Sequence, residues 1–534
     1  MIYDKKKILR ALISVTDKGQ LEPLVQALCE KGVEIISTGG TKKFIEDLGI
    51  SVTSIEKVTG NPEAFGGRMK SISFPVTSAL LYRRHHPTDL AEAKELKIEA
   101  IDLVVCNLYP FDQYAGKNAE ENILIENIDI GGPLMLRASA KNYESVTVLS
   151  AVSDYEEFIK NFNELEGATT FKMRRDLAIK TFTRVAEYDI LIAEELSTRF
   201  LEDYKTGDLP WLSFKPIMSL RYGENPHQWA KIFKLKNTKA SQNLADADIL
   251  QGKELSYNNW MDADAAWRVM SDVANISFGK NIVAVIKHAN PCGLAVANST
   301  IEALEEAWNG DNISSFGGIV AFSHEVNSDC AQFLGEKFIE VVIAPSFSTE
   351  ALSIFSKKKN VRLLKTNIRA KVESEFIVKS ISGALLMQNE DESNGVKEDL
   401  KLVTKVQMTS SALELIDFGI LACKHLKSNG IALVYKTPKG ILTLAGTGMG
   451  QPNRLDSLKL LAKTRAEQKG LPLDKMLLIS DAFFPFADSV EVCHELGIKA
   501  IVQPGGSIRD NEVIEACDNF GIAMMTTGKR HFRH

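Results

Sequence analysis

A lysine and a histidine stand side by side where an apolar run ends. The run is Ile282–Ile286, and Lys287 and His288 follow it directly. A histidine can exchange a proton near neutral pH, and a lysine beside it supplies a fixed positive charge for a developing anion. The next segment, Asn290–Gly293, contains a proline that fixes φ and a glycine that tolerates positive φ, so the sequence predicts a rigid turn there. A core histidine beside a surface lysine is the alternative interpretation.

Hydroxyl groups, glycines and a lysine gather at the ends of two apolar runs near the N-terminus, 11–15 and 33–37. Glycines let the backbone curl close to an anion, and the N–H groups of the following turn point at it. The residues concerned are Ser14, Thr16, Lys18, Thr38, Gly39, Gly40 and Thr41. Because neighbouring strand ends meet at one edge of a sheet, the sequence predicts a phosphate site there. A purely structural Gly-Gly turn is the alternative.

Cations, hydroxyl groups and a carboxylate occupy turns farther along the N-terminal part. They are Arg68, Lys70, Ser71, Tyr109, Asp129 and Lys141. Beside a phosphate site, these groups suit a nucleotide substrate and a dehydration step. Taken singly, each also fits a solvated loop, a packing tyrosine or a solvent-facing helix.

Four turn-rich segments of the C-terminal part are dense in polar and aromatic residues. They are RYGENPHQ (221–228), SSFGGIVAF (314–322), GTGMGQPNR (446–454) and SDAFFPFADSV (480–490). Polar residues on loops often bind ligands, and an aromatic ring such as Phe316 can pack on a flat molecule. We expect the last three of these segments to join the Lys287–His288 site, although each also has a packing explanation, and any polar residue of RYGENPHQ could instead stabilise its turn.

The overall composition is that of a globular protein with more than one core. The chain has 534 residues, of which 45% are hydrophobic and 25% charged, and its net charge of -6 gives no basic surplus for nucleic acid. Its seven cysteines include no CxxC pair, which argues against a disulfide framework and a structural zinc site. We find neither a signal peptide nor a membrane span, and we expect reduced thiols in a cytoplasmic protein.

Strands alternate with helical patterns in both parts of the chain, which predicts α/β domains with mostly parallel sheets. We expect a domain at 1–200 and a second at 201–534, split into two subdomains near 385–400. A helix capped by Thr16-Asp17 should run to Leu28, and the segment 204–228 shows neither helical nor strand period. Further expected strands are 101–107, 282–286, 318–322, 341–344, 431–435, 500–503 and 522–526.

The order of these motifs resembles one family. ISVTDKG, STGGT, GGRMK, NLYPF, IDIGG, SAKN, RYGENPHQ, KHANPCG, SSFGG, SDAFFPF and the terminal RHFRH follow one another along nearly the whole chain. The chain is similar to the bifunctional purine biosynthesis proteins, which join a phosphoribosylaminoimidazolecarboxamide (AICAR) formyltransferase to an inosine monophosphate (IMP) cyclohydrolase. This resemblance implies an N-terminal methylglyoxal-synthase-like domain and two fused cytidine-deaminase-like subdomains without a catalytic metal. It also implies a homodimer that uses 10-formyltetrahydrofolate, AICAR and formyl-AICAR and binds neither nucleic acid nor membranes.

The resemblance implies a role for each candidate residue. Ser14, Thr16, Lys18, Thr38, Gly39, Gly40 and Thr41 would hold the phosphate in the cyclohydrolase, and Arg68, Lys70, Ser71, Tyr109, Asp129 and Lys141 would surround the reacting groups. His288 would be the base for the AICAR amine and Lys287 would stabilise the tetrahedral intermediate. AICAR would be bound by Arg221, Tyr222, His227, Asn429, Gln451 and Arg530. Folate would be bound by Phe316, Phe483 and Asp488.

The chain departs from the pattern of this family at two places. Ser71–Pro75 is one residue longer than the usual T-L-H-P, and Asn453 replaces a common serine.

A zinc deaminase is disfavoured because the second cysteine and an upstream H-x-E are missing. A nucleotide sensor that has lost its chemistry is the remaining alternative, and the retained lysines, histidine and tyrosine argue against it.

Overall fold

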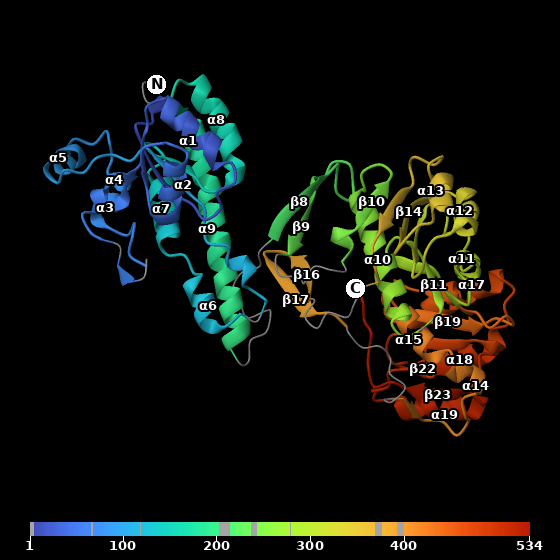
Figure 1. The fold of residues 1–534 in the computed structure, drawn as a ribbon. Coiled ribbons are helices and arrows are strands. Elements are labelled where there is room, and N and C mark those ends of the chain that lie inside the picture. The colour runs from blue at the N-terminus through green and yellow to red at the C-terminus, as the bar shows by residue number, and fades with distance from the viewer. Residues whose placement is uncertain are drawn as a thin grey trace. The chain divides into compact units, whose positions relative to one another are not determined.

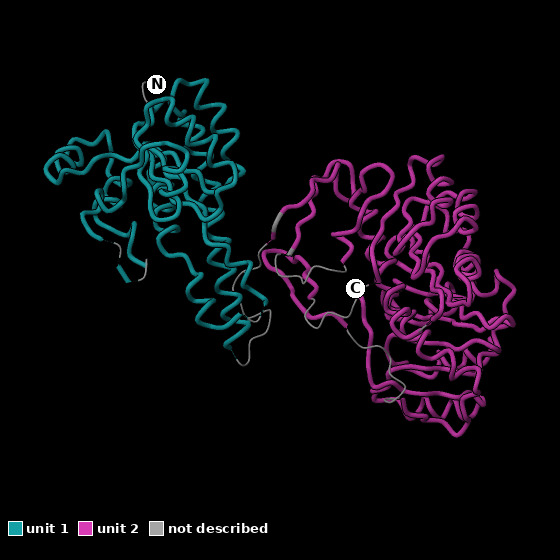
Figure 2. The backbone as a smooth tube through the Cα atoms, in the orientation of Figure 1, with its two compact units in different colours: residues 1–213 teal, residues 214–534 magenta. Residues whose placement is uncertain are grey.

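The computed structural model divides the chain into two compact units, residues 1–213 and 214–534 (Figures 1 and 2). It describes residues 5–62, 64–65, 68–117, 119–201, 214–235, 243–277, 279–368, 376–391 and 400–534. The predicted boundary near residue 200 adjoins the segment 202–213, which lies outside the described residues. So do 392–399, within the predicted split, and Gly66-Gly67 of the GGRMK motif.

The first unit is built on a five-stranded parallel sheet in the order β4-β3-β2-β5-β6. Its strands are β4 (Thr53–Ser54), β3 (Glu34–Ser37), β2 (Arg10–Ser14), β5 (Leu103–Cys106) and β6 (Thr147–Leu149). The chain extends the sheet from β2 first towards β3 and then, in the other direction, towards β5. Ligands bind outside the carboxyl ends of strands at such a switch point, so the edge after β2 and β5 is the expected crevice.

Helices cover both faces of this sheet because its strands are apolar on both sides. Ile13 packs with α1 (Leu21–Glu30) and α8 (Tyr155–Glu164), whereas Leu12 packs with α4 (Phe74–Leu81) and α7 (Gly131–Lys141). The remaining helices are α2 (Gly39–Asp47), α3 (Ile55–Thr59), α5 (Pro87–Glu95), α6 (Glu121–Glu126) and the long α9 (Phe171–Phe200). Strands β1 (Lys5–Lys7) and β7 (Ala168–Thr170) form a separate pair.

The second unit contains a twelve-stranded mixed sheet made of two similar halves. In each half an antiparallel hairpin precedes three strands that are parallel to one another. The two hairpins, β11–β12 and β19–β20, lie at the centre of the sheet, where β12 pairs with β20. The first half comprises β11 (Asn281–Lys287), β12 (Asn290–Ala297), β13 (Gly318–Phe322), β14 (Ile339–Ala344) and β15 (Arg362–Lys365). The second comprises β19 (Ile431–Lys436), β20 (Leu442–Gly448), β21 (Leu477–Ser480), β22 (Ala500–Gln503) and β23 (Ala523–Thr526). Short strands β10 (Asp248–Gln251) and β18 (Lys401–Leu402) border the sheet.

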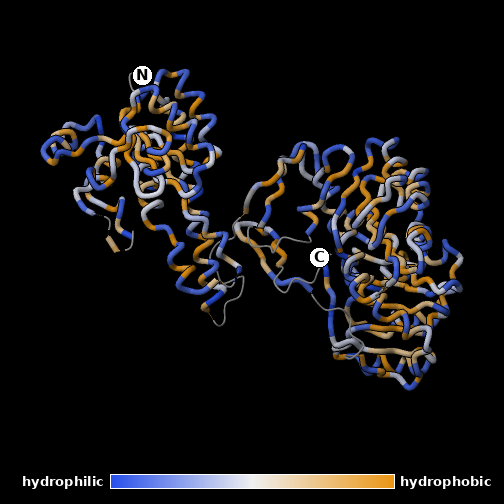
Figure 3. The backbone as a smooth tube through the Cα atoms, viewed as in Figure 1, coloured by the Kyte–Doolittle hydropathy of each residue, from blue (hydrophilic) through white to orange (hydrophobic). Residues whose placement is uncertain are grey.

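The helices of the second unit bury a different set of strand residues on each face. Helices α10 (Tyr257–Ala274) and α15 (Ile416–Lys424) share one core cluster that spans both halves, and smaller clusters cover the other face of each half. Hydrophobic residues are concentrated along the strands of both units (Figure 3). The further helices are α11 (Thr300–Trp308), α12 (Ser328–Gly335), α13 (Thr349–Phe355), α14 (Ser410–Leu413), α16 (Arg454–Asp456), α17 (Lys463–Gln468), α18 (Asp488–Glu495) and α19 (Asp510–Phe520). The predicted α/β class and the parallel N-terminal sheet are confirmed.

The structure corrects the expected turn at KHANPCG. Strand β11 runs to Lys287, the turn consists only of His288 and Ala289, and β12 already begins at Asn290. Pro291 lies where the register between the two strands shifts, a position at which its missing N–H is tolerated. Gly293 is needed for close packing, since a Cβ there would lie 1.7 Å from the carbonyl oxygen of Ala307.

Two other local predictions are also wrong. Helix α1 begins at Leu21 with Gln20 as its N-cap, while the Asp17 carboxylate instead accepts a hydrogen bond from the N–H of Gly19 at 2.8 Å. The segment 204–228 does contain a strand, β8 (Phe214–Leu220), which pairs with β9 (Ala230–Leu235) around a bulge after Pro216. A second exposed hairpin joins β16 (Phe376–Ile381) to β17 (Ala384–Asn389).

Candidate active sites

In the first unit, the ends of β2 and β5 are tied together by a residue that sequence reasoning did not select. The side-chain oxygen of Asn107, directly after β5, accepts hydrogen bonds from the N–H groups of Thr16 (2.7 Å) and Asp17 (3.0 Å). Its amide donates to the carbonyl of Asp17 at 2.8 Å. Asn107 therefore fixes the loop that follows β2 and keeps Thr16 and Lys18 at the switch point of the sheet.

The N-terminus of α2 lies at the same edge and has the features of an anion site. Thr38 is its N-cap in extended conformation and makes no side-chain capping bond, and its hydroxyl is 3.5 Å from that of Ser14. Gly39 and Gly40 form the first turn of the helix, where N–H groups are unpaired within the helix. The Thr41 hydroxyl is occupied differently: it donates to the carbonyl of Val15 at 2.9 Å and holds α2 against β2.

Lys70 reaches this anion site. A Cβ at Gly39 would lie 3.6 Å from the Lys70 ammonium, so a side chain at position 39 would crowd it. The longer segment after Lys70 begins α4, because the Ser73 hydroxyl accepts the N–H of Val76 at 3.4 Å as an N-cap. Ser71 is buried, and its hydroxyl lies 3.1 Å from where a Cβ of Gly131 would be. The altered loop thus delivers Lys70 and Ser71 to the predicted crevice.

Asp129 is a buried carboxylate at the start of α7. One of its oxygens accepts the N–H of Gly132 at 2.8 Å, and its carboxylate also accepts a backbone hydrogen bond from Tyr109. Burial raises the pKa of Asp129 above its usual range, and the two hydrogen bonds only partly offset this effect. A carboxyl group with a raised pKa is suited to exchanging protons in a dehydration reaction.

Two other predicted residues of the first unit have exposed side chains. Arg68 is exposed and forms an ion pair with Glu126. Lys141 is the exposed last residue of α7, and the helical rise places its Cα about 15 Å from that of Gly131. The structure therefore brings Lys70, Tyr109 and Asp129 to the same edge of the sheet but does not bring Lys141 there.

In the second unit, Lys287 and His288 leave the end of β11 in different ways. The Lys287 ammonium donates to the carbonyl oxygens of Phe316 (3.1 Å) and Gly317 (2.9 Å). An ammonium has three donors, so this anchoring leaves one N–H for a ligand. His288 belongs to the turn itself, with φ of 51°, so it is not forced to the opposite face of the sheet from Lys287.

An aromatic pair adjoins the anchored lysine. Phe316 and Phe338 are both largely exposed, and their ring centroids lie 5.0 Å apart. Phe338 was not selected from the sequence, because a single phenylalanine before a strand carries no signal of its own. Exposed aromatic rings beside a cation suit the recognition of a flat heterocycle.

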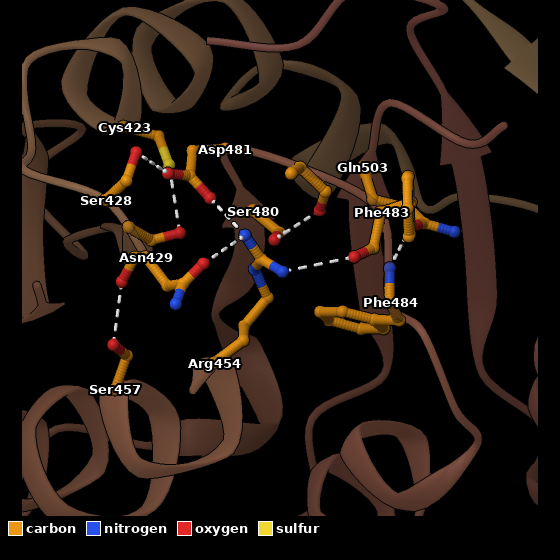
Figure 4. Close-up of polar contacts among 12 residues, drawn as sticks. Cys423, Ser428, Asn429, Arg454, Ser457, Ser480, Asp481, Phe483, Phe484 and Gln503 are labelled. Carbon is orange, nitrogen blue, oxygen red and sulfur yellow. Dashed lines mark hydrogen bonds and ion pairs between the residues drawn. The ribbon is translucent and has the colours of Figure 1, made fainter. Parts of the chain in front are cut away.

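A polar network in the second half of the sheet joins two of the predicted segments, 446–454 and 480–490, to the predicted residue Asn429 (Figure 4). Arg454 donates to the side-chain oxygen of Asn429 at 3.0 Å and to the fully buried Asp481 at 2.7 Å. It also donates to the carbonyl of Phe483 at 3.2 Å, and Asn429 donates to the carbonyl of Gln451 at 2.9 Å. This network fixes Asn429, Gln451 and Phe483 relative to one another, and its central pair, Arg454 and Asp481, was not among the predicted site residues.

The side-chain amide of Asn290 connects the His288 turn to the segment that contains Asn429. The Asn290 side chain donates to the carbonyl of His288 at 2.9 Å and accepts the N–H of Lys427 at 3.2 Å. Lys427 lies two residues before Asn429. The structure therefore places the predicted base and the Asn429 segment of the same chain close together.

The other predicted binding residues lie on exposed segments. The Arg221 guanidinium is 5.7 Å from the Tyr222 ring centroid in a turn closed by hydrogen bonds between Asn225 and Gln228, and His227 is exposed in it. Arg530 lies 4.4 Å from the Phe532 ring centroid in the C-terminal segment. That segment is held by Arg533, whose N–H donates to the Ser428 hydroxyl at 3.0 Å. Asp488 is the first residue of α18.

Comparison with known proteins identifies the family. The model of the "AICARFT/IMPCHase bienzyme" family matches residues 139–464, and that of the "MGS-like domain" matches residues 20–134. The chain belongs to the AICARFT/IMPCHase bienzyme family. "Bifunctional purine biosynthesis protein PurH" of Lactococcus lactis subsp. cremoris (strain MG1363) is 43% identical over 98% of this chain and 99% of its own length. The PurH of Acetivibrio thermocellus is 44% identical over 99% of this chain and 100% of its own length. The PurH of Persephonella marina is 41% identical over 98% of this chain and 99% of its own length.

Three further observations concern the described part of the chain. Among the residues that the structure describes, no cluster of histidine, cysteine, aspartate and glutamate side chains could hold a metal ion. Within the same residues, no helix is long and apolar enough to cross a membrane. The six cysteines other than Cys29 are buried, and burial raises the pKa of each of these thiols.

The bienzyme also contains a buried histidine that should make its second unit sensitive to acid. His425 accepts an Arg533 N–H at 3.2 Å through one ring nitrogen and contacts Asp272 at 2.9 Å through the other, an arrangement that requires the neutral ring. Burial lowers its pKa from 6.5 to about 4. Between these values the unfolded chain binds more protons, so the free energy of unfolding should decrease by roughly 1–3 kcal/mol as the pH falls from 6.5 to 4.

This expectation can be tested by urea unfolding followed by tryptophan fluorescence, since Trp260, Trp267 and Trp308 all lie in the second unit. A His425→Gln variant keeps a donor for Asp272 but cannot titrate. Its free energy of unfolding should decrease less than that of the wild type over this range. Equal decreases in both proteins would show that His425 is protonated in the folded state.

Proposed function

We propose that the two reactions of this bienzyme are divided between its two units, with ring closure in the first and formyl transfer in the second. The enzyme catalyses the last two steps of IMP synthesis, in which AICAR is formylated and formyl-AICAR is cyclised. The observation that carries the division is the separation of the reactive groups. Lys70, Tyr109 and Asp129 lie at the switch point of the first unit, whereas Lys287 and His288 end a strand of the second.

Ring closure joins the carboxamide nitrogen to the formyl carbon and expels the formyl oxygen as water. The phosphate would be bound by the hydroxyls of Ser14, Thr16 and Thr38 and by the N–H groups of Gly39 and Gly40, with the Lys18 ammonium as a counter-charge. Lys70 and Tyr109 would stabilise the oxyanion formed on attack. Asp129, whose pKa burial raises, would give a proton to the departing hydroxyl group.

Four residues have supporting or open roles in this scheme. Thr41 supports the phosphate site indirectly by positioning α2. Arg68 and Ser71 are proposed to border the substrate, and a catalytic role of Lys141 stays a prediction from the family resemblance.

Formyl transfer joins the AICAR amine to the formyl carbon and breaks its bond to folate nitrogen. The amine is a poor nucleophile because its lone pair is delocalised, so removal of its proton by His288 would assist attack. The remaining N–H of Lys287 would stabilise the tetrahedral oxyanion, and the protonated His288 would then return the proton to the leaving nitrogen. We propose 10-formyltetrahydrofolate as the donor, with its flat ring near Phe316, Phe338 and Phe483.

The binding groups of this site follow from the polar network. Asn429 and Gln451 are fixed by Arg454 and are proposed to orient AICAR. Arg221, Tyr222, His227 and Arg530 are exposed or half-buried and are proposed to bind its ribose phosphate, and Asp488 is proposed to bind the folate. The test is an absorbance assay of each half-reaction, in which AICAR with the formyl donor, and formyl-AICAR alone, are supplied separately. AICAR binding without turnover would contradict the proposal.

We further propose that the enzyme acts as a homodimer in the cytoplasm. The β8–β9 and β16–β17 hairpins of the second unit expose large apolar side chains that a lone chain would leave in water. They are Phe214, Ile217, Met218, Phe233, Ile377, Ile381, Leu385, Leu386 and Met387. Sedimentation equilibrium should give twice the chain mass, and a single-chain mass at micromolar concentration would contradict the dimer.

A further inference from the structure

The turn that presents His288 is a strained one. His288 and Ala289 have φ of 51° and 58°, in the left-handed region, although neither is glycine, asparagine or aspartate. Two-residue hairpin turns favour Asn-Gly here because a Cβ at positive φ is sterically unfavourable. The register of β11 and β12, with Lys287 opposite Asn290, leaves no extra residue to relieve this strain. A contact from outside the hairpin would therefore add to the bond that Asn290 makes to the His288 carbonyl and stabilise the turn further.

Asp262, on α10, supplies that stabilisation. One of its carboxylate oxygens accepts the N–H of Ala289 at 2.6 Å, and the carboxylate also accepts a backbone hydrogen bond from His288. Both N–H groups of the turn thus point to one negative charge, which also interacts electrostatically with Lys287 and His288. Hydrogen bonds to a charged acceptor are stronger than those between neutral groups. Burial raises the pKa of Asp262, and the two hydrogen bonds together with the nearby Lys287 and His288 oppose that effect.

We propose that Asp262 is a positioning residue for formyl transfer, which holds the 288–289 backbone in the positive-φ turn and thereby aims the His288 imidazole at the amine. This inference rests on the proposed role of His288. Asp262 touches the backbone of the base and none of the reacting atoms. It lies 26 residues before His288 in the sequence, so the contact arises only from the packing of α10 beside β11.

The test compares three substitutions by steady-state formyl transfer. Asp262→Ala should lower kcat by about 10–100-fold with little change in the KM for AICAR, because misplacing a catalytic group costs rate rather than binding. Asp262→Asn keeps one acceptor oxygen and should lower kcat less than Asp262→Ala does. Asp264→Ala is the matched control, since Asp264 lies on the same helix but pairs with Arg268 at 2.7 Å and is partly exposed. It should retain nearly the wild-type kcat.

A rescue experiment separates positioning from a general loss of structure. Glycine adopts positive φ without a steric cost, so Ala289→Gly added to Asp262→Ala should recover much of the lost kcat. Two results would overturn the proposal. One is an unchanged kcat in Asp262→Ala. The other is a loss of kcat in Asp262→Asn and Asp262→Ala that Ala289→Gly does not reduce. If His288→Ala itself retained formyl transfer, the proposed base would fail instead, and the two failures are distinguishable in one series of assays.

Discussion

Replacing His288 by alanine is expected to lower the rate of formyl transfer by about 10²–10⁴-fold, the usual contribution of a positioned general base. The AICAR amine needs help to lose its proton, and no other histidine lies in the β11–β12 turn. The same variant should cyclise supplied formyl-AICAR at the wild-type rate, because the residues proposed for ring closure lie in the first unit. Absorbance changes for each half-reaction, measured on one preparation, check both expectations.

A matched histidine controls for nonspecific effects of the substitution. His494 lies on α18, where it stacks on Phe520 with 4.4 Å between ring centroids, and has no proposed part in either reaction. His494→Ala should leave both activities near wild type. Equal loss of both activities in His288→Ala would contradict separate sites.

The second large effect is expected for Lys70→Ala, which should lower cyclisation by about 10²–10³-fold, as loss of one oxyanion donor does. The Lys70 ammonium lies beside Gly39 in the phosphate site, so the KM for formyl-AICAR should also rise. Formyl transfer to AICAR should continue, and formyl-AICAR should accumulate in place of IMP. Chromatography of the products distinguishes the two compounds directly.

The control for this substitution is the exposed Lys43 on α2, the helix that forms the phosphate site. Lys43→Ala removes one positive charge, as Lys70→Ala does, but from an exposed position on α2, so cyclisation should change little. If Lys43→Ala and Lys70→Ala reduced cyclisation to the same extent, the effect of Lys70 would be one of overall charge.

The elements of this fold could be predicted where apolar runs decide them. The strand at 318–322 has the bounds expected from the sequence, because a buried strand between glycine and polar residues leaves few alternatives. The start of α1 was misjudged because Asp17, a good capping residue by type, instead closes a short turn with Gly19. The Asn290–Gly293 segment was misjudged because proline and glycine usually mark turns, whereas here a register shift and a close contact with Ala307 explain them.

For the candidate sites, the sequence could predict only residues that belong to short local motifs. Lys70, Asp129, Lys287 and His288 each belong to a short motif, and their neighbours along the chain suggested their chemistry. The contacts that support these sites join motifs that are far apart in the sequence: Asn107 binds a loop 91 residues away, and Arg454 pairs with Asp481, which lies 27 positions further along the chain. Such contacts depend on which strands become neighbours in the sheet, and this order is a property of the folded chain.

The most direct test of the division between two units is complementation in a mixture of the two inactive variants. His288→Ala and Lys70→Ala, each given AICAR and the formyl donor alone, should form no IMP at an appreciable rate. Mixed together, they should form it, since formyl-AICAR released by the Lys70 variant can be cyclised by the His288 variant. A mixture that accumulates formyl-AICAR but yields no IMP would contradict the account.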